Sequence, residues 1–304
     1  HTVVMETKLP LPVFIKGKVR DTYDLGNHLL IIATDRISAF DVVLPTGIPL
    51  KGHVLNRLSN FWFRITKEIV PNHLVEMLDD LHSLDLFLPE ENRFNYPSYL
   101  RGRSMIVKKV KRLPLECVVR GYLSGSAWAE YKEKGTIGGR NMPKGMNESQ
   151  ELPEAMFTPT TKEENGHDQP VTKDYVSKVF GVRISQELEE KSIVLYKSAR
   201  KYALSKGIII ADTKFEFGID NGKLILIDEA LTPDSSRFWD AEKYQVGKPQ
   251  ESFDKQPVRD WLTASGWNKE PPAPELPPDV VKATTQRYMT AYERLTGRKM
   301  AILE

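Results

Sequence analysis

Apolar and charged side chains alternate most clearly along residues 208–220. The segment opens with three consecutive isoleucines, and a β-branched run of this kind favours a buried strand. From residue 212 the charged residues share one parity, and the threonine and aromatic residues share the other. Because successive side chains of a strand point to opposite faces, the pattern predicts one charged and one apolar face. The charged face carries Asp212, Lys214 and Glu216, and the apolar face carries Thr213, Phe215 and Phe217.

A turn and a second strand follow, and the length of the turn decides which residues face one another. The turn reads Asp-Asn-Gly, which is typical of a tight hairpin. A two-residue loop would pair Asp220 with Lys223 and would place Asp228 opposite Phe215, on the aromatic face. A three-residue loop, with the glycine in the left-handed conformation, would place Asp228 opposite Lys214 instead.

Only the three-residue loop gathers the charged residues of both strands on one face, with Asp228 diagonal to Glu216. The other interpretation is the solvated face of an edge hairpin, and this stretch alone favours neither. The remaining motifs of the chain favour a site. We therefore expect a loop of odd length, or an equivalent bulge, that brings Asp228 onto the face of Lys214 and Glu216.

The rest of the chain shows patterns typical of short strands mixed with amphipathic helices. Residues 79–102 read as an irregular surface excursion, and residues 135–170 as a long functional loop with few apolar anchors. A proline-rich stretch at 271–278 reads as a stiff linker. The strands are expected within 13–50 and 104–110, and the helices within 51–70, 127–134, 173–206, 256–264 and 279–296.

One candidate anion site lies near the start of the chain. Gly17 is followed by Lys18 and Arg20, and a glycine lets backbone N–H groups approach an anion closely. A single glycine lacks the spacing of a P-loop or of a dinucleotide fingerprint. A plain polar hairpin is the favoured interpretation of this segment taken alone.

A second candidate anion site lies in the middle of the chain. The turn Gly-Tyr-Leu-Ser-Gly-Ser at 121–126 opens a helix directly after Arg120, and such a turn offers N–H groups and a guanidinium to a phosphate or carboxylate. The alternative is a helix cap beside a surface arginine. A rigid turn at 231–236 could also aim Arg237 inward.

Composition limits the class of protein. The chain has 304 residues, of which 40% are apolar and 28% charged, enough for a buried core and a charged surface. The net charge of +2 predicts no general binding to nucleic acid or anionic membranes. Cys117 is the only cysteine, so an internal disulfide is excluded and a reducing, cytoplasmic location is expected. No apolar run approaches the roughly 20 residues of a membrane span.

Neighbouring carboxylates without paired histidines indicate a hard cation held by oxygen ligands. Mg²⁺ fits because it takes one or two carboxylates together with phosphate oxygens. A lysine between the carboxylates and a basic glycine turn elsewhere indicate a nucleoside triphosphate. The residue types therefore predict ATP-dependent activation of an acidic substrate.

Two long motifs resemble the signatures of the phosphoribosylaminoimidazole-succinocarboxamide synthase (SAICAR synthetase) family. They read Leu-Pro-Leu-Glu-Cys-Val-Val-Arg-Gly-Tyr-Leu-Ser-Gly-Ser at 113–126 and Ile-Ile-Ala-Asp-Thr-Lys-Phe-Glu-Phe-Gly at 209–218. Shorter motifs at 17–20, 35–41 and 233–240 also fit, in the expected order. The likeness covers essentially the whole chain, in the longer form of the family.

The resemblance implies the reaction ATP + CAIR + L-aspartate → ADP + phosphate + SAICAR in purine biosynthesis, where CAIR is the 4-carboxylated aminoimidazole ribonucleotide. The CAIR carboxylate would form an acyl phosphate, from which the aspartate amine displaces phosphate; amine attack before phosphorylation is the alternative. The implied fold is α+β, with a kinase-small-lobe-like N-terminal antiparallel sheet, an ATP-grasp-like domain and a C-terminal helix. The expected segments are 1–112 with the phosphate-covering hairpin, 113–270 with the catalytic residues, and 271–304 with the linker and C-terminal helix.

The resemblance also implies a role for each candidate residue. Glu216 and Asp228 would hold Mg²⁺. Lys214 would neutralise charge on the transferring phosphoryl group or the carboxylate, and Asp212 would orient Lys214 or contact the imidazole amine. The remaining roles are ATP binding by Gly17, Lys18, Arg20, Lys111, Leu113 and Glu116, CAIR binding by Arg120, Ser126, Lys162, Asp168 and Arg237, and aspartate binding by Asp35 and Ser38.

Two other functions fit parts of the pattern. A different ATP-dependent carboxylate–amine ligase on the same fold would keep the ATP residues but change the anion pocket, and the presence of Arg120, Ser126 and Arg237 argues against it. A non-catalytic nucleotide-binding module would have lost the lysine or the carboxylates of the hairpin, all of which are present. A monomer is expected because no apolar seam stands out.

Overall fold

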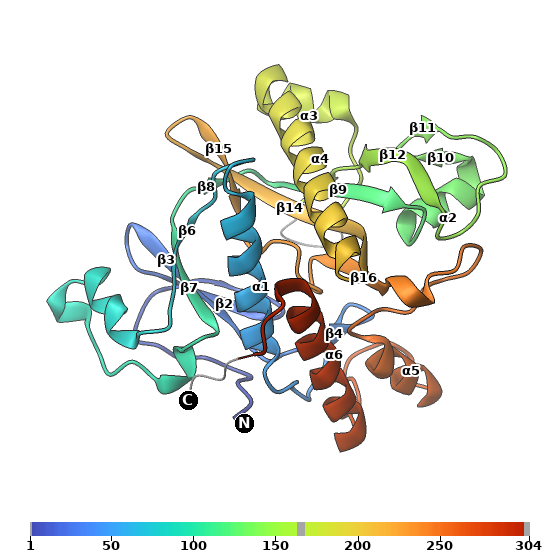
Figure 1. Ribbon diagram of the computed structural model, residues 1–304. Helices are drawn as coiled ribbons and strands as arrows, with labels where there is room; N and C mark the ends of the chain where they lie inside the picture. The colour runs from blue at the N-terminus through green and yellow to red at the C-terminus, as the bar shows by residue number, and fades with distance from the viewer. Residues whose placement is uncertain (1, 163–167, 301–304) are drawn as a thin grey trace. The chain divides into compact units, whose positions relative to one another are not determined.

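The computed structural model describes residues 2–162 and 168–300, and the chain divides into two compact units (Figure 1). The first unit comprises His1–Phe61, His73–Lys109 and Phe253–Glu304, and the second comprises Trp62–Asn72 and Val110–Ser252. This division differs from the three expected segments. Residues 253–304 cluster with the N-terminal part of the chain, and residues 62–72 cluster with its middle part.

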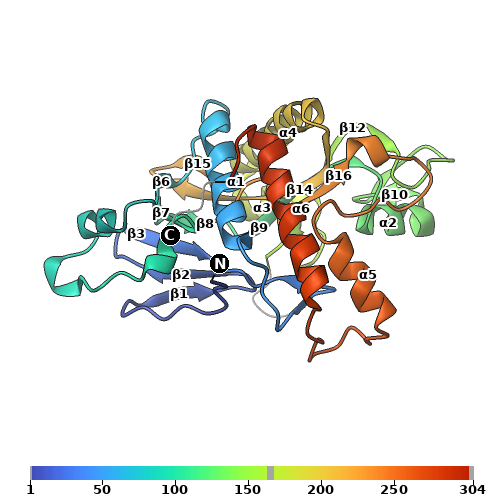
Figure 2. The same ribbon diagram turned by 60° about the horizontal axis from the view of Figure 1, so that its bottom comes forward.

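The first unit is built on a five-stranded antiparallel sheet with the order β1-β2-β3-β7-β6. β1 and β2 flank the Gly17 turn, where Lys16 pairs with Asp21, and β2 continues the pairing from Arg20 to Ala33 of β3. Figure 2 shows β1, β2 and β3 side by side. The strands are β1 (Val13–Lys16), β2 (Arg20–Asp24), β3 (His28–Ala33), β6 (Leu74–Met77) and β7 (Ser104–Lys108), with a separate short pair β4 (Ser38–Ala39) and β5 (Val42–Val43).

An apolar cluster in this unit joins alternate residues of the sheet to the segment at 79–102. Tyr23, Leu30, Ile32 and Ile106 are buried together with Leu84 of that segment. The segment lacks regular strands or long helices, as expected, and folds as three short 3₁₀ turns. The turns are η1 (Leu81–Leu86), η2 (Glu90–Asn92) and η3 (Ser98–Leu100).

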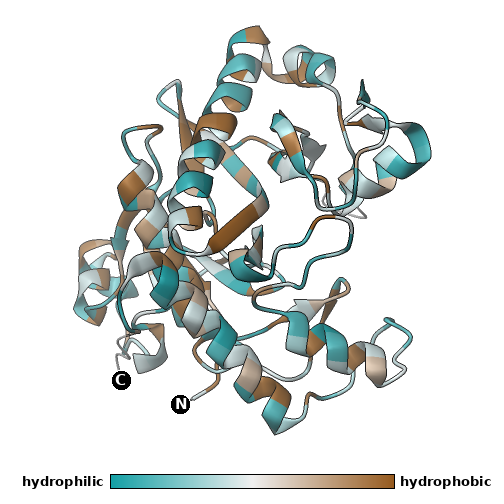
Figure 3. Cartoon of the chain, turned by 45° about the vertical axis from the view of Figure 1, so that its right-hand side comes forward, coloured by the Kyte–Doolittle hydropathy of each residue, from teal (hydrophilic) through white to brown (hydrophobic). Residues whose placement is uncertain are grey.

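The helices follow the predicted apolar stripes. In α6 residues three and four apart are buried, namely Val280, Thr284, Tyr288, Ala291 and Leu295, so the helix expected at 279–296 is amphipathic. Hydrophobic and hydrophilic stretches succeed one another along the helices (Figure 3). None of the helices in the described ranges combines the length and apolarity that a bilayer crossing requires. Helices α5 (Gln256–Ala264) and α6 (Pro278–Thr296) belong to the first unit, and α1 (Lys51–Thr66) is divided between the two units after Phe61.

The second unit is organised around β14, which runs for 13 residues and pairs with four other strands. The long helix α4 packs against β14 (Figure 1). Its Tyr196 hydroxyl donates to the Ile210 carbonyl over 2.7 Å. The strands are β8 (Lys111–Arg112), β9 (Leu115–Tyr122), β12 (Glu151–Phe157), β13 (Thr160–Thr161), β14 (Ile208–Asp220), β15 (Lys223–Ile227) and β16 (Ser236–Asp240), and the helices are α2 (Ser126–Lys134), α3 (Lys173–Phe180) and α4 (Val182–Ser205).

The register of the β14–β15 hairpin corrects the expectation of an odd-length loop. Asp220 pairs with Lys223, so the loop has two residues. Asn221 and Gly222 both have positive φ, at 50° and 78°. Paired positive φ angles are typical of the type I′ turn, whose twist matches that of the flanking strands, so the two-residue loop is favoured. β15 then ends at residue 227, and Asp228 leaves the ladder at a φ of 69°.

The segment at 135–170 is also more ordered than expected. It contains a small hairpin of β10 (Thr136–Ile137) and β11 (Arg140–Asn141), followed by β12 and β13, which both pair with β9. A few apolar residues suffice to anchor it: Met146, Leu152 and Met156 are buried with Leu123 and Ala127. The described part of the expected loop therefore contains short strands and a small apolar cluster, and residues 163–167 lie outside the described residues.

Candidate active site

Three adjacent strands bring two arginines to one carboxylate in the second unit. The register places Asp212 of β14 opposite Arg120 of β9 on one side and opposite Arg237 of β16 on the other. The Asp212 Oδ2 atom lies 3.1 Å from Arg237 Nη1 and 3.9 Å from Arg120 Nη1. We call these three residues the arginine cluster. Its two guanidinium groups exceed its one carboxylate, so the cluster favours a further anion.

Hydroxyl groups hold Arg120 in place. Its Nε donates to Thr158 Oγ1 over 2.9 Å, and its Nη2 donates to Ser126 Oγ over 2.8 Å. Burial lowers the pKa of Arg120, and the charge of Asp212 opposes that shift. The contact between Arg120 and Ser126 brings together two of the residues expected at one anion pocket. Thr158 was not singled out from the sequence, because a threonine in a threonine- and proline-rich segment carries no distinguishing signal.

Close packing of the turn before α2 joins Arg237 to the same cluster. Gly125 adopts a φ of 61°, and a Cβ atom there would lie 1.9 Å from Arg237 Nη1. The same Nη1 atom lies 3.4 Å from Ser124 Oγ, to which it donates. Only a residue without a side chain allows the turn to approach the guanidinium this closely. The motif at 121–126 therefore shapes a surface for Arg237 as well as starting a helix.

The position of Asp212 corrects one expected role. Asp212 contacts the two arginines, because they are its direct cross-strand neighbours. Lys214 lies two positions further along β14, and its Nζ atom lies 3.7 Å from Glu116 Oε2. In this structure Glu116, rather than Asp212, is therefore the carboxylate beside Lys214.

A second cluster lies further along β14, where Lys214 and Glu216 of that strand are joined by Glu116, Lys162 and Asp228 from other segments. We call it the carboxylate–lysine cluster. The Lys162 ammonium contacts the Glu216 carboxylate and lies 3.4 Å from Glu116 Oε1. Glu216 is almost fully buried, whereas the Lys214 side chain is 58% exposed. The sequence had assigned Lys162 to CAIR alone and gave no sign of its contacts with Glu116 and Glu216.

Two carboxylates act on one another within this cluster. The pKa of Glu216 is raised from 4.5 to about 7, mainly by burial and then by the negative charge of Asp228, while Lys162 opposes the shift. The pKa of Lys162 is raised: its burial acts against the charged form, but the charges of Glu216, Asp228 and Glu116 outweigh that effect. Asp228 therefore acts electrostatically on Glu216 although it stands outside the ladder.

These carboxylates fit a hard cation. Two mutually repelling oxygen ligands, one of them buried, are the donor set that Mg²⁺ uses when phosphate oxygens and water complete its shell. Among residues 2–162 and 168–300, no group of three or more His, Cys, Asp or Glu side chains could hold a metal by itself. The donors present therefore match a cation that arrives with a phosphate ligand better than a permanently bound structural metal.

The remaining candidates of the second unit lie near β14. Lys111 of β8 pairs with Ile219, and the Leu113 amide donates to the Phe217 carbonyl over 2.9 Å. Both residues therefore lie beside the C-terminal end of β14, away from the arginine cluster. Asp168 is half-buried and directly follows the undescribed residues 163–167.

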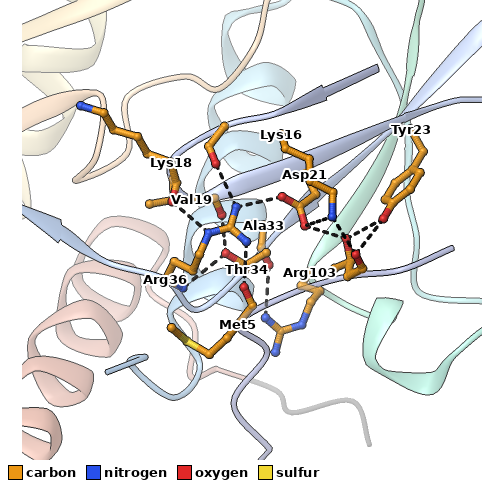
Figure 4. Close-up of polar contacts among 12 residues, drawn as sticks. Met5, Lys16, Lys18, Val19, Asp21, Tyr23, Ala33, Thr34, Arg36 and Arg103 are labelled. Carbon is orange, nitrogen blue, oxygen red and sulfur yellow. Dashed lines mark hydrogen bonds and ion pairs between the residues drawn. The ribbon is translucent and has the colours of Figure 1, made fainter. Parts of the chain in front are cut away.

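In the first unit, Arg36 organises the turn that carries Gly17, Lys18 and Arg20. Its guanidinium donates to the carbonyl oxygens of Gly17 and Lys18 over 3.0 and 2.9 Å, and to Asp21 Oδ1 over 2.8 Å (Figure 4). The Lys18 side chain is 61% exposed, with Nζ 4.0 Å from Asp41 Oδ1. The turn is thus held from one side while its lysine reaches into solvent.

Asp35 was expected to bind aspartate, but in the structure its carboxylate bonds to other parts of the first unit. The side chain is fully buried. Its Oδ1 accepts from Arg103 Nη1 over 3.0 Å and from the Gly52 amide over 2.9 Å, and its Oδ2 accepts from the Val4 amide over 2.9 Å. Both oxygens are therefore used to join separate segments of the unit. Ser38 is half-buried in β4.

Comparisons with known proteins find relatives along almost the whole chain. Residues 13–274 match a family model described as SAICAR synthetase. The phosphoribosylaminoimidazole-succinocarboxamide synthase of Thermodesulfovibrio yellowstonii is 53% identical over 296 residues, covering 97% of this chain and 99% of that protein. SAICAR-synthase from Saccharomyces cerevisiae complexed with SAICAR has a TM-score of 0.90 and 44% identity, covering 98% of this chain and 100% of that chain.

A more distant structure, a SAICAR synthetase (Type-2) in complex with ADP, has a TM-score of 0.68 and 26% identity, covering 95% of this chain and 100% of that chain. The expected α+β fold class is confirmed by these neighbours. A family match over most of the chain, together with a relative more than half identical along its whole length, leaves one assignment: the chain belongs to the SAICAR synthetase family.

Proposed function

We propose that this protein joins L-aspartate to the carboxylate of CAIR, with conversion of ATP to ADP and phosphate, to give SAICAR. The chain is a carbon–nitrogen ligase of its family, class EC 6.3.2.6. The observation that carries the proposal is that one strand, β14, contributes residues to two chemically different clusters. Asp212, Lys214 and Glu216 follow at every second position of β14, so neighbouring members are roughly 6.5 Å apart.

The arginine cluster is proposed to hold the phosphate of CAIR. A guanidinium group offers paired N–H donors that match phosphate oxygens. Arg120 is oriented for this by Thr158 and Ser126, and Ser126 also begins helix α2, whose N-terminal amides favour an anion. One related structure is described as complexed with SAICAR, which supports a ribonucleotide ligand here.

The carboxylate–lysine cluster is proposed to hold the reacting groups. Glu216 and Asp228 would hold Mg²⁺, which supplies neutralising charge to the nucleotide phosphates when bound. Lys162 would then exchange its contact with Glu216 for the carboxylate of CAIR. Asp168 is assigned to CAIR as well, on the resemblance.

Two segments of the sequence are proposed to bind the nucleotide, the glycine turn at 17–20 and the backbone at 111–113. Gly17, Lys18 and Arg20 are assigned to the triphosphate. The backbone from Lys111 to Leu113, with Glu116 nearby, is assigned to adenine. A related structure described as a complex with ADP supports a nucleotide ligand.

Lys214 is proposed as the central catalytic residue. Its exposed ammonium would lie between the CAIR carboxylate and the γ-phosphate and reduce their mutual repulsion. A carboxylate oxygen would bond to the γ-phosphorus while the bond to the leaving ADP oxygen breaks. The aspartate amine would then attack the acyl carbon, and phosphate would leave with the oxygen it received. Positioning and charge neutralisation would supply most of the catalysis, since CAIR, ATP and aspartate are all anionic molecules.

An ADP-release assay with CAIR, with and without L-aspartate, tests the overall reaction. Production of ADP must depend on CAIR, and SAICAR must appear only with aspartate; ADP release that ignores CAIR would contradict the proposal. The acyl phosphate is tested with ATP labelled by ¹⁸O in the bridge between the β- and γ-phosphorus atoms. Scrambling of the label with CAIR present and aspartate absent supports the acyl phosphate, and no scrambling favours amine attack first.

A further inference from the structure

The turn between β1 and β2 has three consecutive carbonyl groups fixed from one side. Arg36 donates to the carbonyls of Gly17 and Lys18 from Nη2 and Nε, over 3.0 and 2.9 Å. Thr34 donates to the carbonyl of Val19 from its hydroxyl over 2.6 Å and from its amide over 3.0 Å. The orientation of each peptide unit in the turn is therefore set by residues 34 and 36.

This arrangement determines where the amide hydrogens point. In a planar trans peptide the C=O of one residue and the N–H of the next point in opposite directions. Because the carbonyls of Gly17 and Lys18 point to Arg36, the N–H groups of Lys18 and Val19 point away from it. Neither N–H has an acceptor within the part of the chain that the structure describes. Two successive amides that face one way form a concave site for an anion.

Arg36 is itself held rigidly. Its Nη1 donates to the Met5 carbonyl over 2.8 Å, and its Nη2 contacts Asp21 Oδ1 over 2.8 Å (Figure 4). Asp21 is fully buried, and its Oδ2 accepts from the Thr7 hydroxyl over 2.6 Å. A side chain that satisfies four acceptors at once needs the planar fork of a guanidinium, which a lysine lacks.

We propose that Arg36 is a positioning residue that aims the amides of Lys18 and Val19 at the phosphate groups of the nucleotide. The inference rests on the proposed function, which assigns this turn to ATP. It adds that the backbone, oriented from behind by Arg36, binds the phosphate as much as the lysine side chain does. Arg36 does not touch the nucleotide.

The Val19 amide can be observed directly. Labelling with ¹³C-carbonyl lysine and ¹⁵N-valine selects only Lys–Val sequences, which occur at 18–19, 109–110 and 178–179. ADP should shift the Val19 amide proton downfield in the wild-type protein, whereas adenosine, which lacks phosphate, should leave it in place. The Val179 amide, on helix α3, serves as an internal reference.

The substitution Arg36→Lys should abolish this shift and weaken ADP binding by about tenfold or more, the effect expected when charge-assisted hydrogen bonds are lost. Arg93→Lys is the matched control, because Arg93 also donates to two backbone carbonyls and pairs with a carboxylate in the first unit. The KM values for CAIR and aspartate should not change in either variant.

The outcomes separate the inference from the proposed function. If the Arg36→Lys protein binds ADP with wild-type affinity and shows the Val19 shift, Arg36 is not a positioning residue, while the assignment of the turn to ATP stands. If ADP binds the wild-type protein without moving the Val19 amide, the assignment of the turn to the phosphates fails, and the inference fails with it. The wild-type measurement remains decisive even if the variant does not fold.

Discussion

The ammonium group of Lys162 contacts the carboxylate of Glu216, which is the group proposed to bind Mg²⁺. In the absence of metal the lysine thus supplies the positive charge that a buried carboxylate requires. Asp228 increases that requirement because its charge also acts on Glu216. The carboxylate–lysine cluster therefore has one position that favours a cation, and the titration of Glu216 should report on it.

The pH dependence of stability should report the raised pKa of Glu216. Its pKa rises from 4.5 to about 7 in the folded protein, so between these values the folded state binds more protons than the unfolded state. The free energy of unfolding should therefore fall as pH increases through this window. In metal-free buffer, Glu216→Gln should lack this component, which amounts to at most about 3 kcal/mol. Parallel curves of denaturation midpoint against pH for the two proteins would contradict the assignment.

Asp228→Asn should weaken the use of Mg·ATP far more than the binding of CAIR. The substitution removes one of two oxygen ligands while preserving size, so the KM for Mg·ATP should rise by about tenfold or more. Steady-state kinetics at varied Mg²⁺ measure this. Asp220→Asn, at the other end of the same hairpin, is the control. A larger effect on the KM for CAIR would show that the metal assignment is wrong.

Lys214→Ala should lower kcat by about 10²–10³-fold, the range found when a preorganised group that stabilises developing charge is removed. Because the side chain is largely exposed, the melting temperature should change little. Lys223→Ala, an exposed lysine on the partner strand β15, should leave kcat unchanged. Near-normal turnover of the Lys214 variant would refute its catalytic role.

Arg237→Ala should mainly raise the KM for CAIR. The guanidinium is proposed to bind the phosphate of this substrate and takes no part in the transfer, so kcat with saturating CAIR should be changed less than kcat/KM. The KM for ATP should remain within about twofold of wild type. An unchanged KM for CAIR would remove Arg237 from the phosphate site.

Gly125→Ala should also raise the KM for CAIR, although Arg237 itself is not substituted. The added Cβ would lie 1.9 Å from Arg237 Nη1, so the guanidinium must move. Gly135→Ala is the control for a methyl group added at a positive φ, because Gly135 has a φ of 71° and no heavy atom within 4 Å of its Cβ position. Both variants should lose stability, and only Gly125→Ala should lose CAIR affinity. Equal CAIR affinity in the two would contradict the packing argument.

Alternation along residues 208–220 was sufficient to predict the strand that carries the site, because side-chain parity is a local property of the backbone. The position of Asp228 near Glu216 was predicted from a three-residue loop, whereas the loop has two residues. Strand parity assumes a continuous ladder, whereas the positive φ of Asp228 removes it from the ladder. A departure of this kind leaves little trace in the pattern of apolar and polar residues.

Contacts between distant segments were the least accessible from sequence. Lys162 reaches Glu216 across 54 positions, and Arg36 reaches back to a turn 18 and 19 positions earlier. Nothing in the local pattern distinguishes these side chains from other surface cations. Asp35, next to Arg36, was predicted as a ligand because it lies in a polar turn, and the sequence did not predict that it is buried with both oxygens bonded.

The pairing of β14 with four other strands has a consequence for how the enzyme becomes active. Asp212, Lys214 and Glu216 all stand on a strand that is hydrogen-bonded to β8, β9, β15 and β16. Neither cluster can assemble before these strands are in register, and neither can be lost by fraying of an edge. Their amides should exchange with solvent only when the whole unit opens. For this half of the protein, completing the fold and bringing the proposed catalytic groups together are a single event.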